Sequence, residues 1–186
     1  MDIEYFDHPY NTTFFNERCV EVALALKFIE EHPDFIEVGA VLPYYGHTSK
    51  LVIDPFDPKG TDARRIIECD VTGKNVVCIS TLEHIGLDEY GNEVLSDNEA
   101  VESLKQIIDQ AENYFITIPI GYNPKLDEQL LELLDDLNCY GVLRLPREFA
   151  RVPNWEKIHP VTHLMYKYHS PYPFANFVLI ITNKTI

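Results

Sequence analysis

The chain has 186 residues, a length that suits a single domain. Its 15 Lys and Arg residues against 30 Asp and Glu residues give a formal net charge of −15. This balance argues against nucleic acid or an anionic membrane as a partner, because both require clustered cations. Hydrophobic residues make up 46% and charged residues 24%, which are the proportions of a folded domain and exclude a disordered chain.

The absence of a signal-peptide pattern and the spacing of the cysteines predict a cytoplasmic location. The acidic N-terminus lacks the apolar stretch of a signal peptide. The longest apolar run, residues 177–181, is far shorter than the roughly 20 residues of a membrane helix. The cysteines form no CxxC pair and lie in apolar stretches, which predicts free thiols in a reducing compartment. They are Cys19, Cys69, Cys78 and Cys139.

We expect one domain over residues 1–186, made of an N-terminal segment with a helix (1–34) and an α/β core (35–186). The apolar spacing in residues 16–32 has the period of a helix, and Pro33 should end it.

Short apolar runs closed by Gly, Pro or Asp predict seven buried strands. They cover residues 35–39, 51–54, 65–70, 75–80, 114–120, 140–145 and 175–182. Two helices lie between the later strands. One covers 99–112 after a capping box at Ser96 and Glu99, and the other follows the cap Asn123 and Pro124.

This alternation predicts an α/β fold with a Rossmann-like, seven-stranded, mostly parallel sheet covered by helices on both faces. We expect the last strand to run antiparallel. The connections after the first and second strands are close to the lower limit of roughly 10–12 residues for a crossover with its helix. The early crossover helices should therefore be shortened, and the thin cover on that half of the sheet would suit a homodimer.

Polar side chains follow four of the predicted strands, at the edge where an open parallel sheet binds its ligands. Glu37, Asp54 and Asp70 lie at the ends of the first three strands, and Ser80 ends the fourth. A carboxylate accepts hydrogen bonds with both oxygens, so Asp54 is suited to a ribose and Asp70 to an adenine amino group. The ordinary alternative is that these side chains only cap loops.

The pattern resembles class I S-adenosylmethionine-dependent methyltransferases. The similar segments are 36–39, 51–54, 76–86, which contains a Glu-His pair, and 115–123. More narrowly, the chain is similar to small bacterial methyltransferase-like proteins associated with surface-polysaccharide synthesis. The segments that carry this narrower resemblance are 8–13, 37–39, 80–86 and 118–127.

The resemblance implies S-adenosylmethionine as cofactor and a set of binding residues, namely Glu37, Gly39, Tyr44, Gly46, Asp54, Asp70, Val71, Ser80, Thr81 and Leu82. Gly39 would let the backbone approach the amino-acid part of the cofactor, and Glu37 would help to place it. The loop after Gly39 has fewer glycines than the family pattern. Tyr44 or Tyr45 would therefore lie against the cofactor, unless the site has lost it.

The resemblance assigns the other residues to different parts of the cofactor. Asp54 would bind the ribose, Asp70 and Val71 would lie by the adenine, and residues 80–82 would line the sulfonium side. His84 is the candidate catalytic base for a hydroxyl acceptor, because histidine titrates near neutral pH. A structural hydrogen bond is the alternative role for His84.

The resulting hypothesis is a methyltransferase that acts on a small molecule, such as a sugar. The aromatic N-terminal segment and the 146–174 loop would shape the acceptor site. The alternative is a non-catalytic relative that binds a nucleoside, the cofactor or a protein partner. A dinucleotide-dependent oxidoreductase would need a GxGxxG turn, which is absent. We expect no metal site, since only His159 and His163 have ligand spacing and nothing accompanies them.

Overall fold

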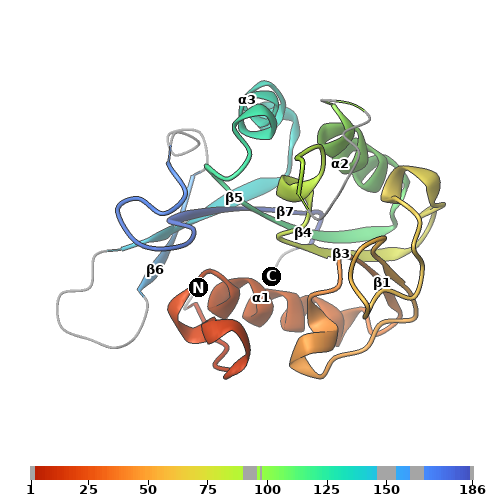
Figure 1. The fold of residues 1–186 in the computed structure, drawn as a ribbon, viewed down its shortest axis with the longest axis horizontal. Coiled ribbons are helices and arrows are strands. Elements are labelled where there is room, and N and C mark those ends of the chain that lie inside the picture. The colour runs from red at the N-terminus through yellow and green to blue at the C-terminus, as the bar shows by residue number, and fades with distance from the viewer. Residues whose placement is uncertain (1–2, 90–95, 97, 146–153, 160–165, 185–186) are drawn as a thin grey trace.

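A seven-stranded mixed sheet forms the centre of the protein (Figure 1), with strand order β2-β1-β3-β4-β7-β5-β6. The computed structural model describes residues 3–89, 96, 98–145, 154–159 and 166–184. The strands are β1 (Phe35–Val38), β2 (Val52–Ile53), β3 (Asn75–Ile79), β4 (Asn113–Pro119), β5 (Cys139–Arg144), β6 (Trp155–Ile158) and β7 (Phe177–Thr182).

One half of the sheet is parallel and the other half is antiparallel. β1 pairs in parallel with β2 and β3, and β3 pairs in parallel with β4. β7 runs antiparallel to β4 and β5, and β6 runs antiparallel to β5. The predicted antiparallel last strand is confirmed. The prediction of a mostly parallel sheet is wrong, because the second half of the sheet is antiparallel. The reason is that one inserted antiparallel strand, β7, makes two antiparallel pairs, and β6 adds a third at the edge.

Two predictions about individual strands are wrong. Residues 65–70 form no strand, because Ile66–Glu68 is a 3-10 turn, η3, in which the Glu68 carboxylate accepts the Arg65 N–H. Only Ile66 of its two isoleucines is buried, so a run that looks strand-like fills the core from a turn. The missed strand is β6, whose central residues Glu156 and Lys157 are exposed at the sheet edge.

Helices cover both faces of the sheet, as predicted (Figure 1). α1 packs on one face, where Phe28 meets Phe115 of β4. α2 and α3 pack on the other face, where Leu104 and Leu130 are fully buried. Their bounds are α1 (Arg18–Glu31), α2 (Glu99–Gln110) and α3 (Pro124–Leu133). Among the described residues, no helix has both the length and the apolar character needed to cross a bilayer.

The early crossovers are short, as predicted. The chain passes from β1 to β2 through a 3-10 turn, η2 (Leu42–Tyr45), and from β2 to β3 through η3. The predicted cap of α3 is confirmed, since the Asn123 side chain accepts the Leu126 N–H at 3.2 Å. The capping box before α2 is wrong. Ser96 Oγ accepts the Asn98 N–H instead of that of Glu99, whose carboxylate pairs with Arg65.

Candidate functional site

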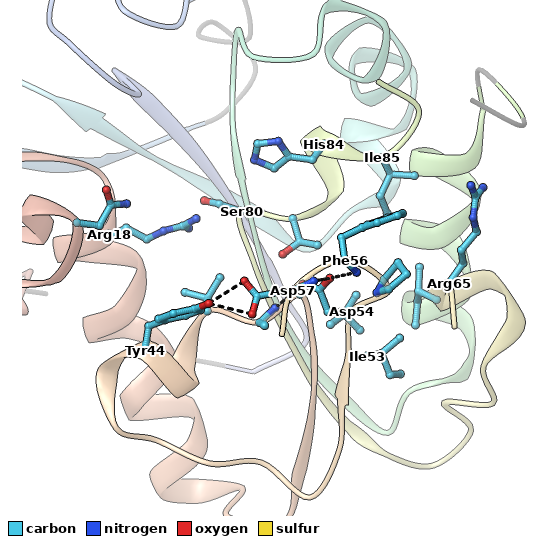
Figure 2. Close-up of a pocket in the computed structure, with 18 of the residues that line it drawn as sticks. Arg18, Tyr44, Ile53, Asp54, Phe56, Asp57, Arg65, Ser80, His84 and Ile85 are labelled. Carbon is cyan, nitrogen blue, oxygen red and sulfur yellow. Dashed lines mark hydrogen bonds between the residues drawn. The ribbon is translucent and has the colours of Figure 1, made fainter. Parts of the chain in front are cut away.

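A cavity of about 350 Å³ opens at the carboxyl ends of β1, β2 and β3 (Figure 2). β1 lies between β2 and β3, so the chain leaves β1 to one side and then returns to the other. Such a reversal of strand order leaves a crevice beyond the strand ends, where open α/β sheets bind their ligands. The cavity volume is within the range of about 300–1,000 Å³ for small-molecule sites.

The structure brings six of the predicted site residues to the cavity wall. They are Gly39, Tyr44, Asp54, Ser80, Thr81 and His84. It places the remaining five elsewhere, and these are Glu37, Gly46, Asp70, Val71 and Leu82. The N-terminal segment contributes Tyr10 and Asn11 to the wall, and its role in an acceptor site stays a prediction. Of the 146–174 loop, residues 154–159 and 166–174 are described and none of them lines the cavity, whereas 146–153 and 160–165 lie outside the described residues.

Glu37 holds the loop that forms one side of the cavity. Its side chain is fully buried, and Oε1 accepts the N–H groups of Val41 and Leu42 at 3.0 and 2.7 Å. Burial raises the pKa of this carboxyl to about 7, although the two N–H groups oppose the shift. Glu37 therefore shapes the β1–η2 loop from behind and does not line the cavity.

Asp54 joins the ends of β1 and β2. Its Oδ2 accepts the Ala40 N–H, and its Oδ1 accepts the N–H groups of Phe56 and Asp57, all at 2.9 Å. A carboxylate has about four acceptor sites, so one remains for a ligand hydroxyl. Asp54 thus builds the cavity floor and keeps a limited capacity to bind a ligand.

Gly39 makes room for a side chain of the protein itself. Its φ of +82° suits glycine, and a Cβ there would lie 1.9 Å from Thr81 Oγ1. The close approach predicted for the cofactor is therefore made by Thr81, which follows β3. Cofactor binding at Gly39 remains a prediction, and Thr81 leaves less space beside this glycine than the resemblance implies.

The residues outside the cavity are displaced for clear reasons. Asp70 is exposed and accepts the Thr72 N–H, because residues 65–70 are no strand and deliver nothing to the sheet edge. Val71 and Leu82 are fully buried in the core on the α2 face. Gly46 ends η2 in a left-handed conformation away from the wall. None of the four contacts the cavity.

His84 enters the cavity with a fixed ring. Its Nδ1 lies 2.8 Å from Glu89 Oε2, and the Tyr122 hydroxyl donates to both Glu89 oxygens at 3.0 and 3.1 Å. The rings of His84 and Tyr122 meet edge-on, with centroids 4.6 Å apart. A hydrogen bond from Nδ1–H to Glu89 leaves Nε2 as the basic atom of a neutral imidazole. This geometry is that of a histidine oriented by a carboxylate.

Ser80 connects the cavity to a buried polar network. Its backbone has a φ of +39°, which is unusual for a residue other than glycine. Its Oγ donates to Glu21 Oε1 at 2.6 Å, and the Thr117 hydroxyl donates to the same oxygen at 2.7 Å. Arg18 Nη1 donates to the other oxygen, Oε2, at 2.8 Å. α1, β3 and β4 are thus tied together behind the cavity.

The two ends of the cavity differ in character (Figure 2). Arg18 and Ser80 lie at one end, and Arg65 lies at the opposite end with Phe56 and Ile85 nearby. The second end is largely apolar, since Ile53 and Ile66 also line it. The Arg65 guanidinium is held by Glu99, with Nη1 2.8 Å from Oε2.

Sequence reasoning missed these arginines. Arg18 begins a helix whose inward residues are apolar, and a charged Arg-x-x-Glu pair in such a helix was the available signal. Arg65 gave no signal, because residues 65–70 resembled a strand. Tyr10 stacks on Tyr44 with centroids 4.7 Å apart, which the aromatic N-terminal segment indicated only in general terms.

No family model, curated protein or solved structure matches the chain. Among the described residues, no group of three or more His, Cys, Asp or Glu side chains is placed to hold a metal ion. Of the His159 and His163 pair, only His159 is described.

Proposed function

We propose that this protein is an S-adenosylmethionine-dependent methyltransferase that acts on a small molecule and binds its cofactor in the cavity at the ends of β1, β2 and β3. The observation that carries the proposal is the position of the cavity. It lies where the strand order reverses, as in the Rossmann-like folds that bind nucleotides. Asp54, Ser80, Thr81 and His84, each singled out by the resemblance, gather in its wall.

The two ends of the cavity suit the two ends of this cofactor. The apolar end offers Ile53, Ile66 and Ile85 as walls for a flat base, with Phe56 at the mouth, where 48% of its surface is exposed. The remaining acceptor site of Asp54 lies between the ends and suits a ribose hydroxyl. Tyr44 and Ser80 lie toward the polar end.

The chain would contribute alignment and a base to the reaction. Methyl transfer is an in-line displacement, so cavity walls that align acceptor and donor supply much of the catalysis. S-adenosylmethionine supplies the methyl group when bound. His84 Nε2 would take the proton of an acceptor hydroxyl as the new oxygen–carbon bond forms and the sulfur–carbon bond breaks. Glu89 would stabilise the resulting imidazolium.

Cofactor binding can be tested by calorimetric titration with S-adenosylhomocysteine, the demethylated product. We expect micromolar binding to the wild type. Phe56→Ala should weaken binding about 3- to 10-fold, because the base loses one wall, worth about 0.5–1.5 kcal/mol. The matched control is Phe15→Ala, since Phe15 is 49% exposed and lies outside the cavity wall. No binding to folded wild-type protein at millimolar ligand would contradict the proposal.

The role of His84 is tested separately by methyl transfer from labelled S-adenosylmethionine to a panel of sugars. We expect His84→Ala to slow transfer by about 10²- to 10⁴-fold, the usual contribution of a general base. The affinity for S-adenosylhomocysteine should stay within about twofold of wild type. Lost affinity together with a lowered melting temperature would instead assign His84 a structural role.

A further inference from the structure

Arg18 is a nearly buried cation at the polar end of the cavity. Its side chain is 16% exposed, and it lines the cavity from the first residue of α1. Figure 2 shows it extending from the α1 side toward Ser80. Cysteines, glycines and apolar residues dominate the usual interior of a protein, whereas a buried arginine requires partners.

The guanidinium makes fewer hydrogen bonds than it can. It carries five N–H donors, and within the described part of the chain its one hydrogen bond runs from Nη1 to Glu21. Glu21 is held in turn by the hydroxyls of Ser80 and Thr117, so it fixes the direction of the arginine. The remaining donors lie at a cavity wall, where a planar acceptor with two oxygens would satisfy them.

The charges around Arg18 allow an anion to enter. Burial raises the pKa of the Glu17 and Glu83 carboxyls, which favours their uncharged forms. Burial lowers the pKa of Arg18, but the carboxylates around it, Glu21 first, raise it by more, so the guanidinium stays charged. Glu21 neutralises this charge in part. A ligand carboxylate would therefore meet spare donors and reduced repulsion.

We propose that Arg18 is the carboxylate-binding group of the cavity and takes a ligand carboxylate through its unused N–H donors. The site of binding follows from the geometry alone. The identity of the ligand rests on the proposed function, and two sources of the carboxylate fit: the amino-acid part of S-adenosylmethionine, or an acceptor that itself carries a carboxylate.

The first experiment compares two ligands that differ only in this group, S-adenosylmethionine and decarboxylated S-adenosylmethionine. If the cofactor supplies the carboxylate, wild-type protein binds S-adenosylmethionine at least about tenfold more tightly. Arg18→Gln abolishes the difference by weakening S-adenosylmethionine alone. Arg18→Lys keeps the charge but loses the planar guanidinium, so it should retain only part of the affinity difference between the two ligands. Arg64→Gln is the control, because Arg64 is exposed, pairs with Asp62 and lies outside the cavity wall.

The second experiment tests the acceptor as the source. Sodium acetate is titrated into protein saturated with S-adenosylmethionine, whose own carboxylate would occupy Arg18 if the cofactor were the source, and the Arg18 Nε–H signal is followed by NMR. A saturable shift of the Arg18 signal, without a shift of the Nε–H signal of the exposed Arg64, assigns the carboxylate to the acceptor.

The outcomes separate this inference from the proposed function. Equal affinity for the two nucleosides together with no acetate response overturns the role of Arg18 and leaves the methyltransferase proposal standing. If neither nucleoside binds, the proposed function fails, and acetate titration of the free protein still decides the role of Arg18. Should Arg18→Gln fail to fold, the comparison of two ligands on wild-type protein needs no variant.

Discussion

At the scale of single residues, Gly39 and Gly46 separate two reasons for a glycine. Both have left-handed backbones, with φ of +82° and +84°. A Cβ at Gly39 would overlap Thr81, whereas a Cβ at Gly46 would meet nothing within 4 Å. Both positions therefore favour glycine for their backbone conformation, but only Gly39 also lacks space for a side chain. Thr81, which follows β3, fills that space.

This difference predicts unequal costs for the same substitution. Gly46→Ala should lower the free energy of unfolding by about 1 kcal/mol, the cost of a left-handed alanine. Gly39→Ala should cost about 2–3 kcal/mol more, because overpacking is added. Urea unfolding of both variants measures the difference. The double variant Gly39→Ala/Thr81→Ala should recover only part of the excess, because Thr81 Cβ would still lie 2.8 Å from the added Cβ. Equal costs for the two single variants would contradict the steric explanation.

At the scale of elements, the N-terminus of α3 connects a helix to the cavity. Asn123 Oδ1 accepts the Leu126 N–H, and its Nδ2 donates to the carbonyl of Glu83 at 3.1 Å. Glu83 precedes His84 in the 3-10 turn η4 (Leu82–His84). One side chain thus caps the helix and anchors the turn that presents the candidate base.

We expect Asn123→Ala to lower the free energy of unfolding by about 1–2 kcal/mol, the upper range for a lost cap, because a second buried hydrogen bond is lost with it. Asn123→Asp keeps the cap and should cost less. Glu128→Ala, at an exposed position of the same helix, is the control. Denaturant unfolding of the three variants gives the comparison, and an Asn123→Ala cost no larger than the control would refute the role of the cap.

Elements differ in how far local sequence specifies them. α1, α3 and β4 were predictable, since each has a long apolar pattern and α3 has an explicit cap. The run at 65–70 was mistaken for a strand because a 3-10 turn can bury one apolar side chain as a strand does. β6 escaped notice because an edge strand with Glu156 and Lys157 exposed has little hydrophobic pattern.

At the scale of the whole molecule, buried carboxyls couple stability to pH. Burial raises the pKa of Glu37 to about 7 and that of Asp127 to about 7. Asp127 Oδ2 accepts the Gly121 N–H, which opposes the shift only in part. The folded protein therefore binds more protons than the unfolded chain between about pH 4 and pH 7, so stability falls as the pH rises through this window.

We expect wild-type protein to be less stable at pH 8 than at pH 5, with Asp127 contributing about 2–4 kcal/mol at about 1.4 kcal/mol per pKa unit. Asp127→Asn keeps an oxygen for Gly121 and should reduce the fall, whereas Asp135→Asn, at an exposed site, should not. Urea unfolding at both pH values measures the change. Stability that is equal or higher at pH 8 would show that these carboxyls titrate normally.

The sequence by itself determined the α/β class, the helices on both faces and the short early crossovers. These features follow from local periodicity, caps and connection lengths, which depend on neighbours along the chain. Two residues of the candidate site, Asp54 and Ser80, were also accessible from sequence, because strand ends in a parallel sheet share one edge. The other four, Gly39, Tyr44, Thr81 and His84, were implied by the resemblance.

Only the tertiary structure decided the insertion of β7, the pairing of β6 and the composition of the cavity. It brought Arg18 of α1 and Arg65, the residue before η3, to opposite ends of one cavity, and it turned Glu37 and Asp54 toward backbone N–H groups. Contacts between segments distant in the chain settle these features. Local sequence patterns do not specify which distant residue a buried charged side chain will contact.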